Sequence, residues 1–268
     1  MNTNKLIQTH IEDNIYFITL NRPEKRNALT IEMLEGISEA AYASDKYPDV
    51  RAIIIHGEGK MFSSGIDVMS LMDAKNKAGN QNPARWLRRM ADRLQYAMHT
   101  IESTELPIIG ALHGYVIGLG LELALTFDFR VANRMCQFRM PETALGLVAD
   151  VGGTTRLARI VGSSRAKDML MTARSIDTEE ALSWGLINRV ANDDDIITEA
   201  IDLAEQIMKN APLAVALTKR IIDQGDGLDK YTQMAIERWA QSQLITTEDL
   251  GEALTAFMTK RQAKFKGR

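Results

Sequence analysis

The stretch His113-Gly114-Tyr115-Val116-Ile117-Gly118-Leu119-Gly120 places three glycines between an apolar run and a helical one. The run before it, 108–112, predicts a buried strand, and the residues after it, 122–126, predict a helix. A second turn, Met61-Phe62-Ser63-Ser64-Gly65-Ile66-Asp67, also follows a buried strand, here 52–55, and precedes a helix. Helix N-termini carry free N–H groups, so two such turns can direct donors at one oxygen. From spacing alone, ordinary tight turns are the simpler interpretation.

Outward from these turns, strand and helix patterns alternate and predict an α/β fold. Lys5–His10 and Ile15–Leu20 alternate in polarity and predict a β-hairpin. Thr30 is a predicted helix cap. The apolar stripe of 87–101 predicts the clearest helix, and the polar stretch 74–83 (AKNKAGNQNP) predicts a mobile loop.

Two β elements followed by a helix occur more than once, at spacings of roughly fifty residues, which indicates a layered unit. From Thr178 onward the pattern is almost entirely helical. We therefore expect an α/β core over 1–195 and a helical C-terminal region over 196–268.

Bulk composition excludes several classes of protein. The 268 residues are 45% hydrophobic and carry a net charge of −3, which gives no reason to expect nucleic-acid or bulk-membrane binding. The longest apolar runs are too short to span a bilayer. The start, MNTNKLIQTH, lacks the pattern of a secretory signal. Cys136, the one cysteine, fits a small buried hydrophobe in a reducing compartment. These features favour a cytoplasmic location.

The usual nucleophile, metal and nucleotide motifs are absent from the sequence. Its four histidines have no metal-ligand spacing, so we expect no metal site. There is no GxSxG elbow or P-loop, and Gly118-Leu119-Gly120 continues to Leu123 where a dinucleotide fingerprint requires glycine. What remains are the two turns and a few carboxylates.

Three carboxylates have positions suited to proton transfer. Glu122 lies early in the helix after the second turn, and Glu142 follows a proline at a strand end. Asp150 lies in an apolar, glycine-rich setting, in which a charge is costly. Taken singly, each also fits a surface position, and Asp150 also fits a cap of the helix that starts near Gly153.

Five blocks resemble, in order and spacing, the crotonase superfamily of enoyl-CoA hydratases and isomerases. They are NRPEKRNALT (21–30), KMFSSGIDVMSL (60–71), HGYVIGLGLELAL (113–125), MPETALGLVADVGGTTRLARIVG (140–162) and AFMTKRQAKFK (256–266). The resemblance covers essentially the whole chain. It implies a crotonase-like spiral of ββα units, a C-terminal helical region that builds trimers, and often a dimer of trimers. It also implies an acyl-CoA thioester substrate, so coenzyme A is part of the substrate and no separate cofactor is expected.

The resemblance also implies the binding residues. The backbone N–H groups of Ser64 and Leu119 would form an oxyanion hole for the thioester oxygen. The family usually has glycine at the position of Leu119, which alters shape more than chemistry because the donor is backbone. The residues implied to bind coenzyme A or the substrate are Lys25, Arg26, Ala28, Ser64, Gly65, Ile66, Asp67, Gly120, Phe257 and Lys260, the last two commonly from a neighbouring subunit. The 68–100 region is expected to form the wall that limits acyl-chain length.

The reaction depends on the carboxylates. Glu122 and Glu142 match the pair with which hydratases add water across a 2-enoyl double bond, and Glu142 alone matches the proton shuttle of Δ3,Δ2-enoyl-CoA isomerases. Asp150 stands where Δ3,5-Δ2,4-dienoyl-CoA isomerases have a catalytic aspartate, although those enzymes usually have aspartate at the position of Glu122. We expect a dienoyl-CoA isomerase in which Glu142 and Asp150 transfer protons and Glu122 is a third carboxylate. The alternatives are a 2-enoyl-CoA hydratase and a non-catalytic acyl-CoA-binding trimer.

Overall fold

The computed structural model describes residues 6–192 and 195–268, and its centre is a six-stranded sheet of order β1-β2-β3-β4-β6-β9. All neighbouring strands are parallel except β1 and β2, which form the predicted hairpin. Lys5, the first residue of that prediction, lies outside the described residues. The strands are β1 (Ile7–Glu12), β2 (Ile15–Leu20), β3 (Ala52–Gly57), β4 (Ile108–Leu112), β6 (Phe129–Asn133) and β9 (Arg189–Ala191).

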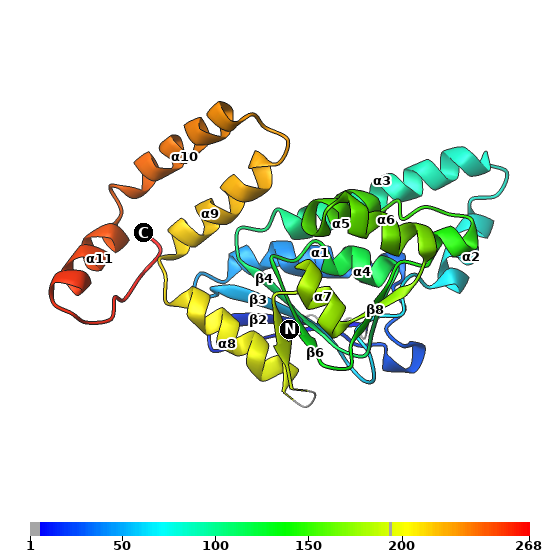
Figure 1. Ribbon diagram of the computed structural model, residues 1–268, viewed down its shortest axis with the longest axis horizontal. Coiled ribbons are helices and arrows are strands. Elements are labelled where there is room, and N and C mark those ends of the chain that lie inside the picture. The colour runs from blue at the N-terminus through cyan, green and yellow to red at the C-terminus, as the bar shows by residue number, and fades with distance from the viewer. Residues whose placement is uncertain (1–5, 193–194) are drawn as a thin grey trace.

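Helices cover both faces of the large sheet (Figure 1). Ile53 and Ile55 of β3 belong to the larger apolar core, and Ile54 between them belongs to a second core on the opposite face. A strand buried on both faces has no polar alternation, which explains the continuous apolar run in the sequence. The helices of the body are α1 (Ile31–Ala43), α2 (Val68–Lys77), α3 (Pro83–Glu102), α4 (Leu119–Ala124), α5 (Gly153–Val161), α6 (Ser163–Thr172), α7 (Thr178–Trp184) and α8 (Ile196–Met208).

A second sheet passes through the stretch that was expected to be a glycine-rich turn. It has the order β5 (Tyr115–Ile117), β7 (Gln137–Arg139) and β8 (Ser175–Asp177). The expectation of a single turn over 114–120 is therefore wrong, because β5 occupies its middle. A three-residue strand is too short for a period-2 pattern to reveal it.

The loop predicted over 74–83 is also wrong in extent. Helix α2 continues to Lys77, and α3 begins at Pro83. The Asn82 side chain caps α3 by accepting a hydrogen bond from Arg85 N at 3.1 Å. The cap predicted at Thr30 is confirmed, since its hydroxyl accepts from Met33 N at 3.1 Å.

The last three helices project from the body (Figure 1). They are α9 (Pro212–Gly225), α10 (Lys230–Leu244) and α11 (Glu248–Met258). The helix before them, α8, packs on β3, β4 and β6, so the first helix after residue 195 covers the sheet. Lys219 of α9 ties the projecting helices to the body through an ion pair with Asp128 at 2.8 Å. Among the described helices, none combines the length and apolar character needed to cross a bilayer.

Candidate active site

Backbone hydrogen bonds join the two glycine-bearing turns. Ser63 N donates to Tyr115 O at 3.1 Å, and Ile117 N donates to Ser63 O at 3.1 Å. This short parallel bridge places the residues after Ser63 beside the start of α4. Turns separated by about fifty residues of sequence thus meet at one point, as parallel strand ends do at the edge of a sheet.

Glycine is required where the turns touch. A Cβ on Gly65, whose φ is 94°, would lie 2.8 Å from Ile117 O and 3.6 Å from Leu119 N. A Cβ on Gly120 would lie 2.7 Å from the Ser63 Cβ. The distances of 2.8 Å to Ile117 O and 2.7 Å to the Ser63 Cβ are too short for any Cβ atom. Only glycine therefore allows the two segments to approach this closely. The contact brings Ser64 and Leu119, the two predicted oxyanion donors, into one site.

The two predicted N–H donors, those of Leu119 and Ser64, differ in whether they already make a hydrogen bond within the protein. Leu119 is the first residue of α4, and its N–H has no protein acceptor among the described residues, as expected for the first turn of a helix. Ser64 N, in contrast, donates to Arg26 O at 3.0 Å. Arg26 has a φ of 55°, in the left-handed region. Leu119 therefore offers a free donor, whereas Ser64 must share its N–H or release Arg26 to bind a thioester oxygen.

Glu122 is buried in the first turn of α4, and the backbone just before and at the start of α5 binds its carboxyl group. Its Oε1 accepts hydrogen bonds from Val151 N at 2.9 Å and from Gly153 N at 2.8 Å. Burial raises the pKa of Glu122 to about 7, and the charges of Glu142 and Asp150 act in the same direction, whereas the two N–H donors oppose the rise. The pKa of Glu122 therefore lies near neutral pH.

Glu142 opens a 3-10 helix, η3 (Glu142–Leu145), and lies against the start of α4. A Cβ on Gly118, the residue before Leu119, would be 2.7 Å from Glu142 Oε1. Glu142 Oε2 is buried and has no hydrogen-bond partner among the described residues. Burial, followed by the charge of Asp150, raises the pKa of Glu142. A carboxylate with one unpaired, desolvated oxygen beside an oxyanion donor is suited to accept a proton from a substrate carbon.

Asp150 lies in the turn before α5, and it does not cap that helix. The N-cap of α5 is Gly152, and no side chain makes the cap hydrogen bond, so that reading of Asp150 is wrong. The backbone carbonyl of Asp150 accepts from Gln95 Nε2 of α3 at 2.6 Å. Its charge raises the pKa of both Glu122 and Glu142, so the three predicted carboxylates lie within electrostatic reach of one another. Among the described residues, however, no acidic cluster is arranged to hold a metal ion.

The residues implied to bind coenzyme A fall into two groups. Lys25 and Arg26 are exposed at the end of the 3-10 helix η1 (Pro23–Lys25). Half-buried Ala28 and Ile66 lie beside them, because Leu29 pairs with Ile66 in a parallel bridge. Hydrogen bonds from Ser64 N to Arg26 O and from Leu29 N to Gly65 O join this first group to the first turn of the site.

Within that group, the Asp67 side chain stabilises the local structure. It caps α2 by accepting from Ser70 N at 2.9 Å and forms an ion pair with Arg22 at 2.5 Å. The hydrogen bond from Ser70 is the largest cause that holds the pKa of Asp67 below its usual value; burial opposes it, and Arg22 lowers the pKa further. The Asp67 carboxylate is thus already engaged by Ser70 and Arg22.

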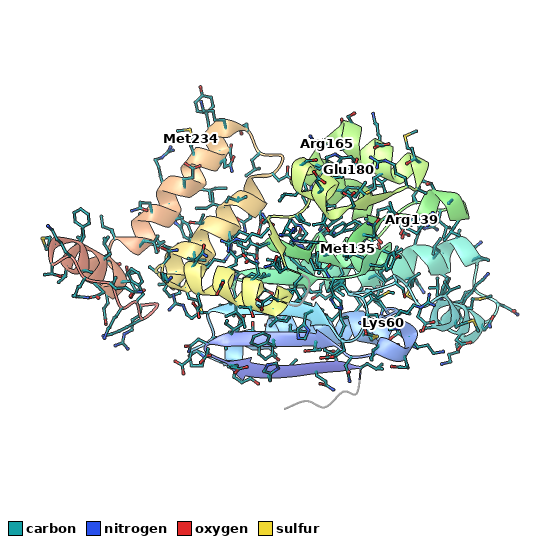
Figure 2. All side chains as sticks on the ribbon, turned by 60° about the horizontal axis from the view of Figure 1, so that its bottom comes forward. Lys60, Met135, Arg139, Arg165, Glu180 and Met234 are labelled. Atoms are coloured by element: carbon teal, nitrogen blue, oxygen red, sulfur yellow. The ribbon has the colours of Figure 1, made fainter. Side chains whose placement is uncertain are left out.

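Phe257 and Lys260 form the second group, and the single chain does not bring them to the site. They lie at the end of α11, at the opposite end of the molecule from α2 (Figure 1). Figure 2 agrees, since Met234 of α10 lies far from Lys60, which precedes the first turn of the site. Phe257 is 84% exposed.

Several residues that organise the site were missed in the sequence. Val151 and Gly153 hold Glu122, Gly118 makes room for Glu142, and Gln95 fixes the turn of Asp150. For Val151 and Gly153, the sequence did hold a signal: the pair Gly152-Gly153 after Asp150. Glycines allow backbone N–H groups to approach a side chain closely, so this pair could have indicated that the turn binds a carboxylate. For Gln95, on an exposed helix face, the sequence holds no signal.

Comparisons with known proteins agree with this geometry. Residues 10–268 match the family model "Enoyl-CoA hydratase/isomerase". The chain is 34% identical to a short-chain-enoyl-CoA hydratase of Clostridium acetobutylicum, over 96% of each protein. It is 32% identical to a peroxisomal Δ3,5-Δ2,4-dienoyl-CoA isomerase of Arabidopsis thaliana, over 98% of this chain and 96% of the relative.

A solved structure extends the agreement to the fold. An enoyl-CoA hydratase from Bacillus anthracis superimposes with a TM-score of 0.89 at 32% identity, covering 98% of this chain and all of the other. The chain belongs to the enoyl-CoA hydratase/isomerase family and is an enzyme of that family. The predicted crotonase-like α/β fold with C-terminal helices is thereby confirmed.

Proposed function

We propose that the chain is an acyl-CoA isomerase that converts a 3,5-dienoyl thioester into the 2,4-dienoyl isomer. The observation that supports this reaction is the third carboxylate. Asp150 adds to Glu142 and Glu122 a third carboxyl group within electrostatic reach, which can serve the second of the two proton transfers that this reaction requires.

In the proposed reaction, the thioester oxygen accepts a hydrogen bond from Leu119 N, and from Ser64 N once Arg26 releases it. Glu142 removes a proton from C2, and the electron pair moves into the carbonyl to form a dienolate held by these donors. The electrons return through the conjugated chain, and C6 takes a proton from the carboxyl group of Asp150. Double bonds then stand at C2 and C4, and one carboxyl group has gained the proton that the other lost.

The electrostatics of the site favour a protonated carboxyl group. Burial disfavours the charged forms of Glu122 and Glu142, and the neighbouring carboxylates add to this effect. The pKa of Glu122 is raised to about 7, and that of Glu142 is also raised. We assign Glu122 the role of tuning its neighbours.

Coenzyme A recognition completes the proposal. Lys25 and Arg26 would meet the phosphates, and the backbone over 64–67, with Ala28 and Gly120, would line the path to the oxyanion donors. Phe257 and Lys260 lie at the other end of the chain, so a neighbouring copy would have to supply them. We therefore propose a homotrimer, or a dimer of trimers, in which α11 of one subunit reaches the site of the next.

Hydration of a 2-enoyl-CoA is the second candidate function. Glu122 Oε1 is held by two N–H groups, so the carboxyl group is fixed in direction beside Glu142, as the positioning of a water molecule requires. Curated relatives named as hydratases, such as the one from Clostridium acetobutylicum, favour this candidate.

A paired assay separates the candidates. The wild type and the Asp150→Asn variant are each given crotonyl-CoA and a 3,5-dienoyl-CoA. Isomerisation by the wild type, lost by about 100-fold or more in Asp150→Asn, supports the proposal. Fast hydration that is insensitive to Asp150→Asn, with the diene untouched, refutes it in favour of the hydratase. Saturable binding of either ester without turnover indicates a non-catalytic acyl-CoA-binding protein.

A further inference from the structure

A polar cavity adjoins the three carboxylates on the side of Asp150. It has a volume of about 390 Å³ and opens between α3 and the start of α5. The residues that line it are Gln95, His99, Ala149, Asp150, Gly152, Thr154, Thr155 and Arg156. Most of them carry hydrogen-bonding side chains, which is unusual for a space that would hold a plain hydrocarbon chain.

The cavity and the carboxylate cluster share one wall, the turn over 149–153. On one side of this turn, Val151 N and Gly153 N hold Glu122. On the other side, Ala149, Asp150 and Gly152 line the cavity. The turn is fixed from across the cavity, because Gln95 Nε2 donates to the Asp150 carbonyl at 2.6 Å.

The order of the groups along a bound substrate directs the acyl chain into this space. The thioester oxygen lies at Leu119 N, the adjacent carbons at Glu142, and the remote reacting carbon at Asp150. Carbons beyond that point pass Asp150 and enter the cavity that Asp150 lines. This step rests on the proposed function.

Three side chains that line the cavity have unoccupied hydrogen-bonding groups. The hydroxyls of Thr154 and Thr155 and the His99 ring make no side-chain hydrogen bond to the described residues. A hydrocarbon tail would leave them without partners and would displace their water, which is a poor exchange. A hydroxyl or carbonyl oxygen on the tail would pair with them.

The charges of the cavity argue against a carboxylate on the tail. The Arg156 guanidinium is already engaged by Glu102, with Nε to Oε1 and Nη2 to Oε2 both at 2.8 Å. Among the described residues that line the cavity, Arg156 is the one lysine or arginine, so a carboxylate on the tail would find no free cation there. It would also lie close to the Asp150 carboxyl group, which lines the same space.

We propose that this cavity binds the distal part of an acyl chain that carries a neutral oxygen function, a hydroxyl or a carbonyl group, beyond the reacting double bonds. The enzyme therefore selects oxygenated acyl-CoA esters over plain and dicarboxylic ones. We expect a modest selection, because the lining side chains are partly open to water and lose only part of their hydrogen bonding when the analogue lacks its oxygen.

The test uses three 3,5-dienoyl-CoA esters of equal chain length, with a methyl, a hydroxymethyl or a carboxyl group at the far end. For the wild type, kcat/KM is expected to favour the hydroxylated ester over the plain one by about tenfold, and the carboxylated ester to be the poorest. In His99→Leu and Thr155→Val the ratio of hydroxylated to plain ester falls towards one. Thr100→Val, next to His99 on α3 but outside the cavity, is the matched control and keeps the wild-type ratio.

Each ratio is taken within one protein preparation, so partial loss of folded enzyme cancels. A wild-type ratio of one or less, or a preference that His99→Leu and Thr155→Val both retain, overturns the proposal. If no diene is isomerised but 2-enoyl esters are hydrated, the proposed function has failed, and the same ratio is then measured by hydration of the matching 2-enoyl series. The two failures are thus distinguishable.

Discussion

Oε1 of Glu122 accepts a hydrogen bond from the backbone N–H of Gly153 at 2.8 Å, across the gap between α4 and α5. A second bond, from Val151 N, reaches the same oxygen. The most buried acid of the site is thus held by the turn that carries Asp150. The position of one carboxylate depends on the backbone that positions another, so the cluster acts as one unit.

The protonation of Glu122 makes stability depend on pH. Its pKa is raised from 4.5 to about 7, mainly by burial. A raised acid pKa gives a contribution that is complete below pH 4.5 and is lost as pH rises through about 7, by about 3 kcal/mol at most. Relative to Glu122→Gln, which stays neutral and can still accept both N–H bonds, the wild type should lose stability between pH 5 and pH 8. Urea unfolding of both proteins at pH 5 and at pH 8 measures this loss. If the difference in free energy of unfolding between wild type and variant is the same at both pH values, the raised pKa of Glu122 is contradicted.

Gly118 lies between Glu142 and Leu119, the proposed oxyanion donor. Gly118→Ala would introduce a Cβ 2.7 Å from Glu142 Oε1 at a φ of 50°. We expect kcat to fall by about 100-fold, because a displacement of about 1 Å in a catalytic group can have that effect. The control is Gly146→Ala, which has a φ of 74° but nothing within 4 Å. Gly146→Ala should lower the free energy of unfolding but leave kcat unchanged. If the two variants lose kcat equally, the contact with Glu142 is not the cause of the loss in Gly118→Ala.

Leu119 offers its backbone N–H, so the donor can be removed only by proline. Proline is tolerated at the first position of a helix, which Leu119 occupies. Leu119→Pro should lower kcat by about 100-fold to 1,000-fold, the usual effect of losing one oxyanion donor. Leu119→Ala keeps the N–H and loses most of the same side chain. If the two variants lose the same activity, with circular dichroism showing both folded, the N–H is not the donor.

Lys219 anchors the projecting helices through a largely buried ion pair. It donates to Asp128 Oδ2 at 2.8 Å and to Leu106 O at 3.1 Å. Lys219→Met would leave Asp128 buried without its cation, which typically costs about 3 kcal/mol or more. The neighbouring pair Arg220–Glu105 is exposed and 3.6 Å apart, so Arg220→Ala should cost less than about 1 kcal/mol. Denaturant unfolding compares the two, and equal losses would show that the buried pair is not the anchor.

Local patterns predicted most of the elements because their causes are local. The apolar period of α3, the hairpin and the Thr30 cap depend on neighbours along the chain. The wrong or missing predictions have two causes. The three-residue strands β5, β8 and β9 exist only because other strands pair with them, and the helical end of 74–83 was hidden by its polar composition.

The sequence by itself determined the two glycine-bearing segments, the three carboxylates and, through five blocks in register, the family. It could do so because each of these features consists of particular residue types at fixed spacings along the chain. Only the tertiary structure decided how they act together. It decided that Gly65 and Gly120 press the turns into contact, that Leu119 has a free N–H while Ser64 donates to Arg26, and that burial moves the pKa of Glu122. These properties depend on distances and on exclusion of water between segments remote in sequence, and no local pattern encodes them.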